Sequence, residues 1–287
     1  MTIAAARRWG ISALRAAGVD SAGLDVRRLL AAALELPEAQ ILARPECHLS
    51  AAHAAVFAAF IERRRGREPV SRILGRREFY GRSFAVSPAT LDPRPESETL
   101  IAAVLEIVRR EGAATLPLRI LDVGTGTGCL ILTLLSELPL ATGLGTDLSE
   151  AALGVARNNA AALGLSPRIG WRATDLLENI EEQFHILVSN PPYLSAVELG
   201  SVEPEVSRFD PRLALDGGAD GLQIFRRLSK GIGKVVSNGW VVVEVGYDQA
   251  DKVAQIFAPL SRGHPGDLRF TRDVSGRRRC VAVRTRN

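Results

Sequence analysis

A stiff polar corner follows one apolar run of the sequence. Asn190, Pro191, Pro192 and Tyr193 come directly after residues 184–189, which read as a buried strand. Proline has no N–H and fixes its own φ, so the corner presents oxygen acceptors rigidly beside a flat ring. Acceptors that hold both N–H bonds of a planar –NH2 group turn its lone pair toward an electrophile. The corner therefore predicts chemistry on an amide or aromatic amine, with Asn190, Pro191 and Tyr193 as catalytic residues.

A glycine-rich turn in LDVGTGTGCL supplies a candidate cofactor site. A P-loop needs Lys followed by Ser or Thr after its last glycine, and a dinucleotide fingerprint needs G-x-G-x-x-G. Cys129 follows a G-x-G-x-G spacing here, so neither pattern fits. The remaining interpretation is S-adenosylmethionine, a methyl donor without phosphate, which explains why no lysine is needed. The predicted cofactor-binding residues of the turn are Gly124, Thr125, Gly126, Thr127 and Gly128.

Two acids support the cofactor interpretation. Asp147 ends the next apolar run, about twenty residues after the turn, where a carboxylate can accept both ribose hydroxyls. Asp175 and Leu176 end the following run and are placed to hold the edge and face of an adenine. Either acid alone could be a helix N-cap. Together with the glycine turn they predict one cofactor site.

Apolar runs alternate with helical patterns after Gly112. Continuous apolar strands separated by helices predict a parallel sheet covered on both faces. A closing hairpin is expected at the end, with Ser275 and Gly276 at its turn. The predicted strands are 118–123, 142–147, 169–174, 184–189 and 240–245, and the predicted helices include 149–163 and 222–236.

The first part of the chain has a different pattern. Residues 1–72 read as an all-helical domain, with apolar stripes that contain Leu24 and Val56 and a helix end at Arg65-Gly66. Residues 73–90 read as a β-hairpin linker around Tyr80 and Gly81. Residues 91–287 form the predicted catalytic domain, beginning with a proline-punctuated segment that opens a helix to about Arg110.

Composition narrows the class of protein. The 287 residues carry a net charge of +4, with a pI near 9.3. Of the 36 basic residues only Lys230, Lys234 and Lys252 are lysines, which leaves 33 scattered arginines and no concentrated nucleic-acid patch. No apolar stretch approaches the roughly 20 residues of a membrane span, and the start lacks a signal-peptide pattern. Three widely spaced cysteines indicate a cytoplasmic protein without a disulfide framework or metal site.

Taken together, four segments resemble the release-factor glutamine methyltransferases. They are DVGTGTG, NPPY, PRPESE (residues 93–98) and LALDGGADGL (residues 213–222). The family usually has Thr where Ser97 stands. The resemblance implies a Rossmann-like, mostly parallel seven-stranded sheet and methyl transfer to the amide nitrogen N5 of the glutamine in a Gly-Gly-Gln motif of peptide chain release factors.

The resemblance also implies roles for single residues. Asn190, Pro191, Pro192 and Tyr193 would hold the substrate glutamine, and Arg94 and Glu98 would line the same pocket. Asn190 would contact the cofactor as well. It further implies a helical N-terminal domain that docks the protein substrate. A monomer without membrane or nucleic-acid partners is expected.

Two other functions fit parts of the sequence. An adenine-N6 methyltransferase acting on DNA or RNA would use the same acceptor corner, but it generally needs a basic target-reading region, and residues 1 to about 75 do not have that composition. A cofactor-binding protein attached to the translation machinery would have no use for a corner that grips an amide. Both alternatives are therefore weaker than the protein-glutamine methyltransferase.

Overall fold

The computed structural model describes residues 1–261 and 266–286, and these form two compact units. The helical unit comprises Met1–Arg76 together with Glu203–Phe209, and the sheet unit comprises Arg77–Val202 and Asp210–Asn287. The first segment of the helical unit thus ends at Arg76, close to the domain end expected at residue 72. The structure also assigns Glu203–Phe209, which the sequence analysis left in the catalytic domain, to the helical unit.

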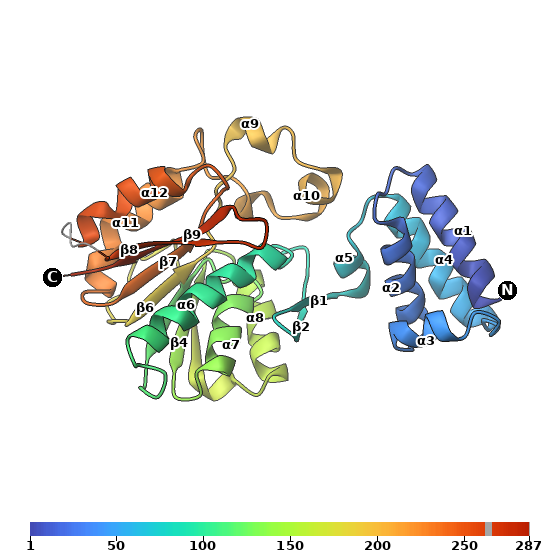
Figure 1. The fold of residues 1–287 in the computed structure, drawn as a ribbon, viewed down its shortest axis with the longest axis horizontal. Helices are drawn as coiled ribbons and strands as arrows, with labels where there is room; N and C mark the ends of the chain where they lie inside the picture. Colours follow the sequence, from blue (N-terminus) through green and yellow to red (C-terminus); the bar gives the residue numbers. More distant parts are fainter. Residues whose placement is uncertain (262–265, 287) are drawn as a thin grey trace. The chain divides into compact units, whose positions relative to one another are not determined.

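The helical unit packs around one apolar core. Leu29 and Leu30 of α2 and Phe57 and Ile61 of α4 are fully buried in it. Val56, expected on the buried stripe, is 43% exposed, because adjacent helical residues point about 100° apart and Phe57 takes the inward direction. Its helices are α1 (Ile3–Ala16), α2 (Ala22–Leu34), α3 (Glu38–Ala43), α4 (Ala51–Arg65), α5 (Val70–Leu74) and α10 (Pro204–Phe209) (Figure 1).

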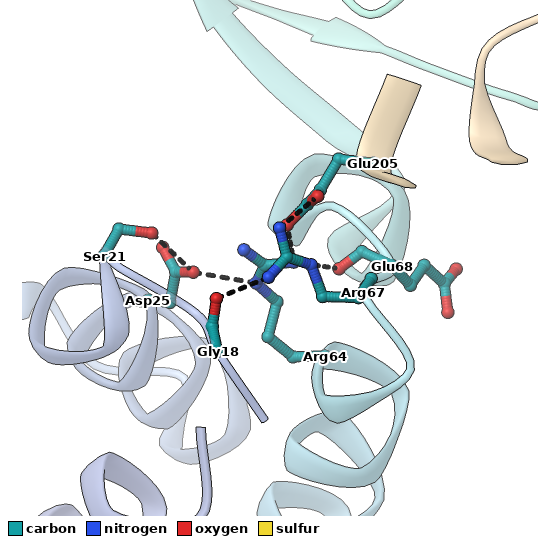
Figure 2. Close-up of polar contacts among 7 residues, drawn as sticks. All are labelled: Gly18, Ser21, Asp25, Arg64, Arg67, Glu68 and Glu205. Carbon is teal, nitrogen blue, oxygen red and sulfur yellow. Dashed lines mark hydrogen bonds and ion pairs between the residues drawn. The ribbon is translucent and has the colours of Figure 1, made fainter. Parts of the chain in front are cut away.

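A largely buried ion cluster joins α10 to the rest of the helical unit (Figure 2). Arg64 donates from Nε to Asp25 Oδ2 at 2.8 Å and from Nη1 to Glu205 Oε1 at 2.9 Å. Arg67 Nη2 donates to Glu205 Oε2 at 2.7 Å, and Ser21 Oγ donates to Asp25 at 2.9 Å. Burial opposes the charge of Glu205, but the hydrogen bonds from Arg67 and Arg64 outweigh it and hold its pKa below the usual value. This Arg64 cluster explains why α10 belongs to the helical unit.

The sheet unit contains a seven-stranded sheet with the order β5-β4-β3-β6-β7-β9-β8. The first five of these strands are parallel and β9 is antiparallel to both neighbours. The predicted mostly parallel sheet and closing hairpin are therefore confirmed. The strands are β3 (Arg119–Val123), β4 (Thr142–Asp147), β5 (Ile169–Ala173), β6 (Ile186–Ser189), β7 (Trp240–Glu244), β8 (Leu268–Arg272) and β9 (Arg278–Arg284).

Helices cover both faces of the sheet (Figure 1). Side chains of α6 (Glu98–Arg110), α7 (Cys129–Glu137) and α8 (Glu150–Ala162) share one apolar core with the strands. Those of α11 (Gln223–Val235) and α12 (Ala250–Phe257) share the core on the opposite face. The expected hairpin is β1 (Arg76–Phe79) with β2 (Arg82–Ala85), followed by η1 (Pro95–Ser97). In residues 1–261 and 266–286, no helix is long and apolar enough to cross a bilayer.

The order of the strands sets the place of a binding site. β3 lies between β4 and β6, so the chain moves outward from β3 in one direction and then crosses over to continue in the other. In open α/β sheets a crevice forms outside the carboxyl ends of the strands at such a reversal. The glycine turn follows β3, Asp147 ends β4 and Asn190 follows β6. The topology therefore brings the predicted site residues to one edge of the sheet.

Candidate active site

A cavity of about 330 Å³ lies at this edge of the sheet unit. It is lined by residues from the segment before α6, the turn after β3, the ends of β4, β5 and β6, and residues 211–216. Of the predicted site residues, it is lined by Arg94, Gly124, Thr125, Gly126, Thr127, Asp147, Asp175, Leu176, Asn190 and Pro192. Within the described residues, the lining does not include four other predicted site residues, namely Gly128, Pro191, Tyr193 and Glu98. The volume falls within the range of small-molecule sites.

The glycine turn presents bare backbone to this cavity. Gly126 has φ +55°, a left-handed conformation that glycine adopts without penalty, and a Cβ added there would meet no atom within 4 Å. A side chain at Gly126 would therefore occupy space that a ligand could fill. Gly128 has another role: it caps α7, and a Cβ there would press on Leu132 at 3.0 Å. The turn thus combines a ligand cradle with a tight helix start.

Asp147 is held in place by backbone groups. Its Oδ2 accepts from Gly126 N and its Oδ1 accepts from Ser149 N, both at 2.9 Å. A carboxylate has about four lone-pair sites, so each oxygen keeps capacity for a further donor. The carboxylate lines the cavity between the glycine turn and α8. This arrangement suits a vicinal diol, as the sequence predicted for a ribose.

The other predicted acid has a partner that the sequence did not reveal. Asp175 Oδ2 accepts from Arg227 Nη2 of α11 at 2.8 Å, and both residues line the cavity. Leu176 lines it too, with a left-handed φ of +53°, and Ile224 of α11 adds a further apolar contact surface. Sequence reasoning missed Arg227 and Ile224, because the amphipathic pattern of α11 does not indicate which turn of the helix reaches the strand ends.

Asn190 is oriented by a serine from the segment before α6. Its Nδ2 donates to Ser97 Oγ at 3.1 Å, and Ser97 is buried. The bond uses the –NH2 end of the amide, so Oδ1 remains as the acceptor available to a ligand. Ser189 Oγ donates to Val123 O at 2.7 Å and ties the end of β6 to β3. In the sequence, Ser97 stands out only as a departure from the family pattern; its contact with Asn190 assigns it a place in the site.

Tyr193 points its hydroxyl at a buried acid. Tyr193 OH donates to Glu244 Oε1 at 3.4 Å, and Glu244, the last residue of β7, is only 1% exposed. Burial raises the pKa of Glu244 to about 7, although the Ser97 side chain, the charge of Arg279 and the Tyr193 hydroxyl all act to lower it. Burial also raises the pKa of Tyr193, with a further contribution from Glu244. Glu244 is not among the residues predicted from the sequence; the signal for it is a lone acid within the apolar run WVVVEV.

The segment LDGGADGL holds the acceptor corner, which we define as residues 190–193. Leu194 N donates to Leu215 O at 3.0 Å, and Gly217 N donates to Leu194 O at 2.8 Å. Gly221 has φ +72°, and a Cβ there would lie 2.4 Å from Tyr193 O. Gln249 Nε2 donates to the same carbonyl at 2.8 Å. Close backbone approach explains why this segment is rich in glycine.

Arg94 and Glu98, predicted as neighbours in one pocket, have separate partners. Arg94 lines the cavity and pairs with Asp210, whose Oδ1 also accepts from Asp92 N at 3.3 Å. Glu98 Oε1 accepts from the backbone N–H of Tyr80 at 2.8 Å, at the turn of the β1–β2 hairpin. The side chain of Glu98 is therefore committed to the hairpin.

A second buried acid lies under the glycine turn. Asp122, in β3, is fully buried, and its Oδ2 accepts from Thr125 Oγ1 at 2.6 Å. Burial raises the pKa of Asp122 to about 7, against the hydrogen bond from Thr125 and with a contribution from the charge of Asp147. The motif DVGTGTG contains this residue, but the motif alone predicts no role for it. Its contact with Thr125 fixes the first half of the turn.

The fold and site define a methyltransferase domain. Residues 104–202 match the family described as methyltransferase small domain, and residues 5–75 match the PrmC N-terminal domain. Among solved structures, the N-terminal domain of human METTL16 in complex with SAH has a TM-score of 0.51 at 19% identity, covering 72% of this chain and 77% of that one. The hMettl16 catalytic domain with an RNA hairpin has a TM-score of 0.57 at 16% identity, with the same coverage. At these identities the likeness concerns the fold alone.

Relatives of higher identity match most or nearly all of the chain. The release factor glutamine methyltransferase of Cereibacter sphaeroides is 42% identical and covers 99% of both chains. The protein of the same name from Bradyrhizobium diazoefficiens is 43% identical, covering 99% of this chain and 95% of its own. That from Agrobacterium fabrum is 44% identical over 85% of both. This chain belongs to the release factor glutamine methyltransferase family.

Proposed function

We propose that this protein transfers the methyl group of S-adenosylmethionine to the side-chain amide nitrogen of the glutamine in the Gly-Gly-Gln motif of peptide chain release factors. One observation carries the proposal: the side-chain amide of Asn190, which is oriented by Ser97, follows β6 and lines the same cavity as the glycine turn. Family membership supports the choice of a protein glutamine over an adenine base.

The residues of the cavity fit a nucleoside methyl donor. The open space at Gly126 accepts a ligand against the backbone, Asp147 keeps lone pairs for two hydroxyls, and Leu176 offers an apolar contact for an adenine. Asp175 would hold the edge of that base while Arg227 keeps its carboxylate in place. When bound, S-adenosylmethionine supplies an electrophilic methyl group on a sulfonium.

The acceptor corner would prepare the glutamine nitrogen. Asn190 Oδ1 and the carbonyl oxygen of Pro191 would accept its two N–H bonds, which turns the lone pair out of the corner and favours positive charge on nitrogen. The methylated nitrogen is acidic, so a strong base is not required to remove its proton. Pro192 lines the cavity beside the corner. Tyr193 would be held in a fixed position by the contact of its hydroxyl with Glu244 and of its carbonyl with Gln249.

The helical unit would recognise the release factor. A pocket that only fits a glutamine side chain cannot distinguish one protein from another, so selectivity needs a second surface. The helical unit is not part of the sheet or of the cavity, and its folded core makes it a rigid platform. Binding energy from remote contacts can align a reacting group. We place this activity in the cytoplasm, in a monomer that needs neither nucleic acid nor membrane.

A labelling experiment tests the proposal. The protein is incubated with radiolabelled S-adenosylmethionine and one of three acceptors: a release factor, the same factor with its Gly-Gly-Gln glutamine changed to alanine, or duplex DNA. Label is expected only on the unchanged release factor, and peptide mass analysis should place it on that glutamine. Labelled DNA would support the adenine-N6 alternative instead. Label on both release factors would mean that the acceptor residue is wrong.

A further inference from the structure

The carboxyl group of Glu244 connects two residues of the acceptor corner. Its Oε1 accepts from the hydroxyl of Tyr193 at 3.4 Å. The Ser97 side chain also interacts with this carboxyl, and Ser97 Oγ accepts from Asn190 Nδ2 at 3.1 Å. Asn190 and Tyr193 lie at opposite ends of the corner. Tyr193 contacts Glu244 directly, whereas Asn190 is linked to it through the hydroxyl of Ser97.

The place of Glu244 makes little sense for stability alone. It stands at the end of a strand whose other members are Trp240 and three valines, all buried. Among the described residues its Oε2 has no hydrogen-bond partner. Its antiparallel partner across the sheet is the uncharged Cys280, and the charge of Arg279 offsets the effect of burial only in part, since the pKa of Glu244 still rises to about 7. A buried carboxyl with an unpaired oxygen destabilises a fold unless another requirement keeps it there.

We propose that Glu244 is a positioning residue for methyl transfer, which accepts from the hydroxyls of Ser97 and Tyr193 and thereby sets the direction of the Asn190 amide. Serine has one O–H to donate and two lone pairs that accept. When Ser97 donates to Glu244, a lone pair faces Asn190, and only the –NH2 end of that amide can turn to it. Asn190 Oδ1 is then left to accept from the substrate.

The ionised carboxylate enforces this polarity because it can only accept, whereas a protonated carboxyl could donate to Ser97 and reverse the bond. Since burial raises the pKa of Glu244 to about 7, the ionised fraction grows as the pH passes through neutrality. Turnover should therefore rise with pH through about 7. Several other titratable or charged groups act on Glu244 or are affected by its charge: Glu96 in η1, Cys129 at the start of α7, Tyr193 after β6, and Arg279 and Cys280 of β9. Both cysteine pKa values and that of Tyr193 are raised, so these three groups stay neutral near pH 7.

The test compares Glu244→Gln with the unchanged protein, and it rests on the proposed function. Turnover on a release factor should fall roughly 10- to 100-fold, as for a misplaced reacting group, while affinity for S-adenosylmethionine changes little. The rise of kcat through about pH 7 should disappear in the variant. Glu178→Gln, at an exposed position, is the matched control. A Glu244→Gln variant with the turnover and pH profile of the unchanged protein would overturn the inference.

A second pair of variants keeps the test open if Glu244→Gln does not fold. Ser97→Thr retains a hydroxyl and should retain turnover, whereas Ser97→Ala breaks the link to Asn190 and should lose it. The double variant Ser97→Ala/Glu244→Gln should be less impaired than the product of its single effects, because both act through one chain of hydrogen bonds. Equal turnover of the Thr and Ala variants would contradict the inference. If the unchanged protein labels no release factor, the proposed function fails and the inference fails with it.

Discussion

Two acidic side chains with little solvent exposure have arginine partners in the helical unit, whereas two in the sheet unit do not. In the helical unit, Asp25 and Glu205 accept from Arg64 and Arg67 at 2.7–2.9 Å. In the sheet unit, Asp122 and Glu244 are more deeply buried, but neither forms an ion pair with a described residue, and burial raises both pKa values to about 7. Paired charges maintain a local structure, whereas unpaired buried acids cluster at sites that perform chemistry. By this comparison, Asp25 and Glu205 stabilise the helical unit, whereas Asp122 and Glu244 belong to the candidate active site.

The largest effect is expected from removing the arginine that two acids share. Arg64→Met should lower the free energy of unfolding at pH 7 by about 3–5 kcal/mol, because it leaves Asp25 without its guanidinium partner and Glu205 with only Arg67. Denaturant unfolding measures this change. Affinity for S-adenosylmethionine, measured on the folded variant, should stay the same.

The pH dependence of this loss has a defined sign. The pKa of Glu205 in the folded protein lies below 4.5, the ordinary pKa of a glutamate. The ion pairs of its carboxylate therefore stabilise the fold fully above about pH 4.5, and this contribution is lost as the pH falls through the lowered pKa. The difference between Arg64→Met and the unchanged protein should therefore shrink in acid. Arg65→Met is the matched control, since its pair with Glu62 is about half exposed on both sides and should contribute less than about 1 kcal/mol. Equal losses at Arg64 and Arg65 would remove the contrast between buried and exposed pairs.

On the catalytic side, Asn190→Ala should lower kcat by about 10²–10³-fold, equivalent to about 2.7–4 kcal/mol, as for the loss of one preorganised polar group facing the reaction. Affinity for S-adenosylmethionine should change much less, because the side chain acts mainly on the attacking amide. Rapid-quench turnover and calorimetry measure the two quantities. Asn190→Asp keeps an acceptor and adds a charge, so it separates orientation from electrostatics. Near-normal turnover of Asn190→Ala would show that the amide is not gripped there.

Parts of this comparison could be read from the sequence and parts could not. Apolar runs gave the strands to within a few residues, and glycine spacing with Asp147 and Asn190 located the cavity, because strand ends in a parallel sheet share one edge. Glu205 could not be assigned, since its arginine partners lie about 140 positions away and only the fold brings them together. Glu98 looked like a pocket residue, but its carboxylate accepts from the hairpin instead. Local pattern predicts elements, and it is silent on which distant side chains meet.

Replacing Glu244 by the neutral glutamine should stabilise the fold and at the same time slow the reaction. The folded state favours protonated Glu244, since its pKa rises from 4.5 to about 7. The resulting penalty is absent below about pH 4.5, grows as the pH rises, and is complete above about pH 7. Glu244→Gln should therefore raise the free energy of unfolding by on the order of 2 kcal/mol at pH 8 and by little at pH 5. Denaturant unfolding at both pH values measures it; a variant less stable than the unchanged protein at pH 8 would mean that the carboxyl is structural.

Loss of Asp147 should act on binding. Asp147→Ala removes two charge-assisted acceptors and should weaken affinity for S-adenosylmethionine by about 1.5–3 kcal/mol, or roughly 10- to 150-fold. Calorimetric titration gives the value directly. Asp251→Ala is the control, because that acid pairs with Arg278 outside the cavity. Unchanged affinity would remove Asp147 from the cofactor site.

The smallest effect concerns the surface of the helical unit. Val56 on α4 is an exposed apolar side chain, and Trp9 of α1 packs edge-on against the neighbouring Phe57 and is itself 41% exposed. Val56→Asp places a charge on this surface without opening the core. If the helical unit docks the release factor, KM for the intact factor should rise roughly 3- to 10-fold, or about 1 kcal/mol. Leu140→Asp is the matched control, since Leu140 is also exposed but precedes β4, at the edge of the sheet opposite the cavity. Methylation of a short Gly-Gly-Gln peptide should be the same in both variants. An equal loss on peptide and protein would mean that the helical unit only stabilises the fold, and an unchanged KM would place the docking surface elsewhere.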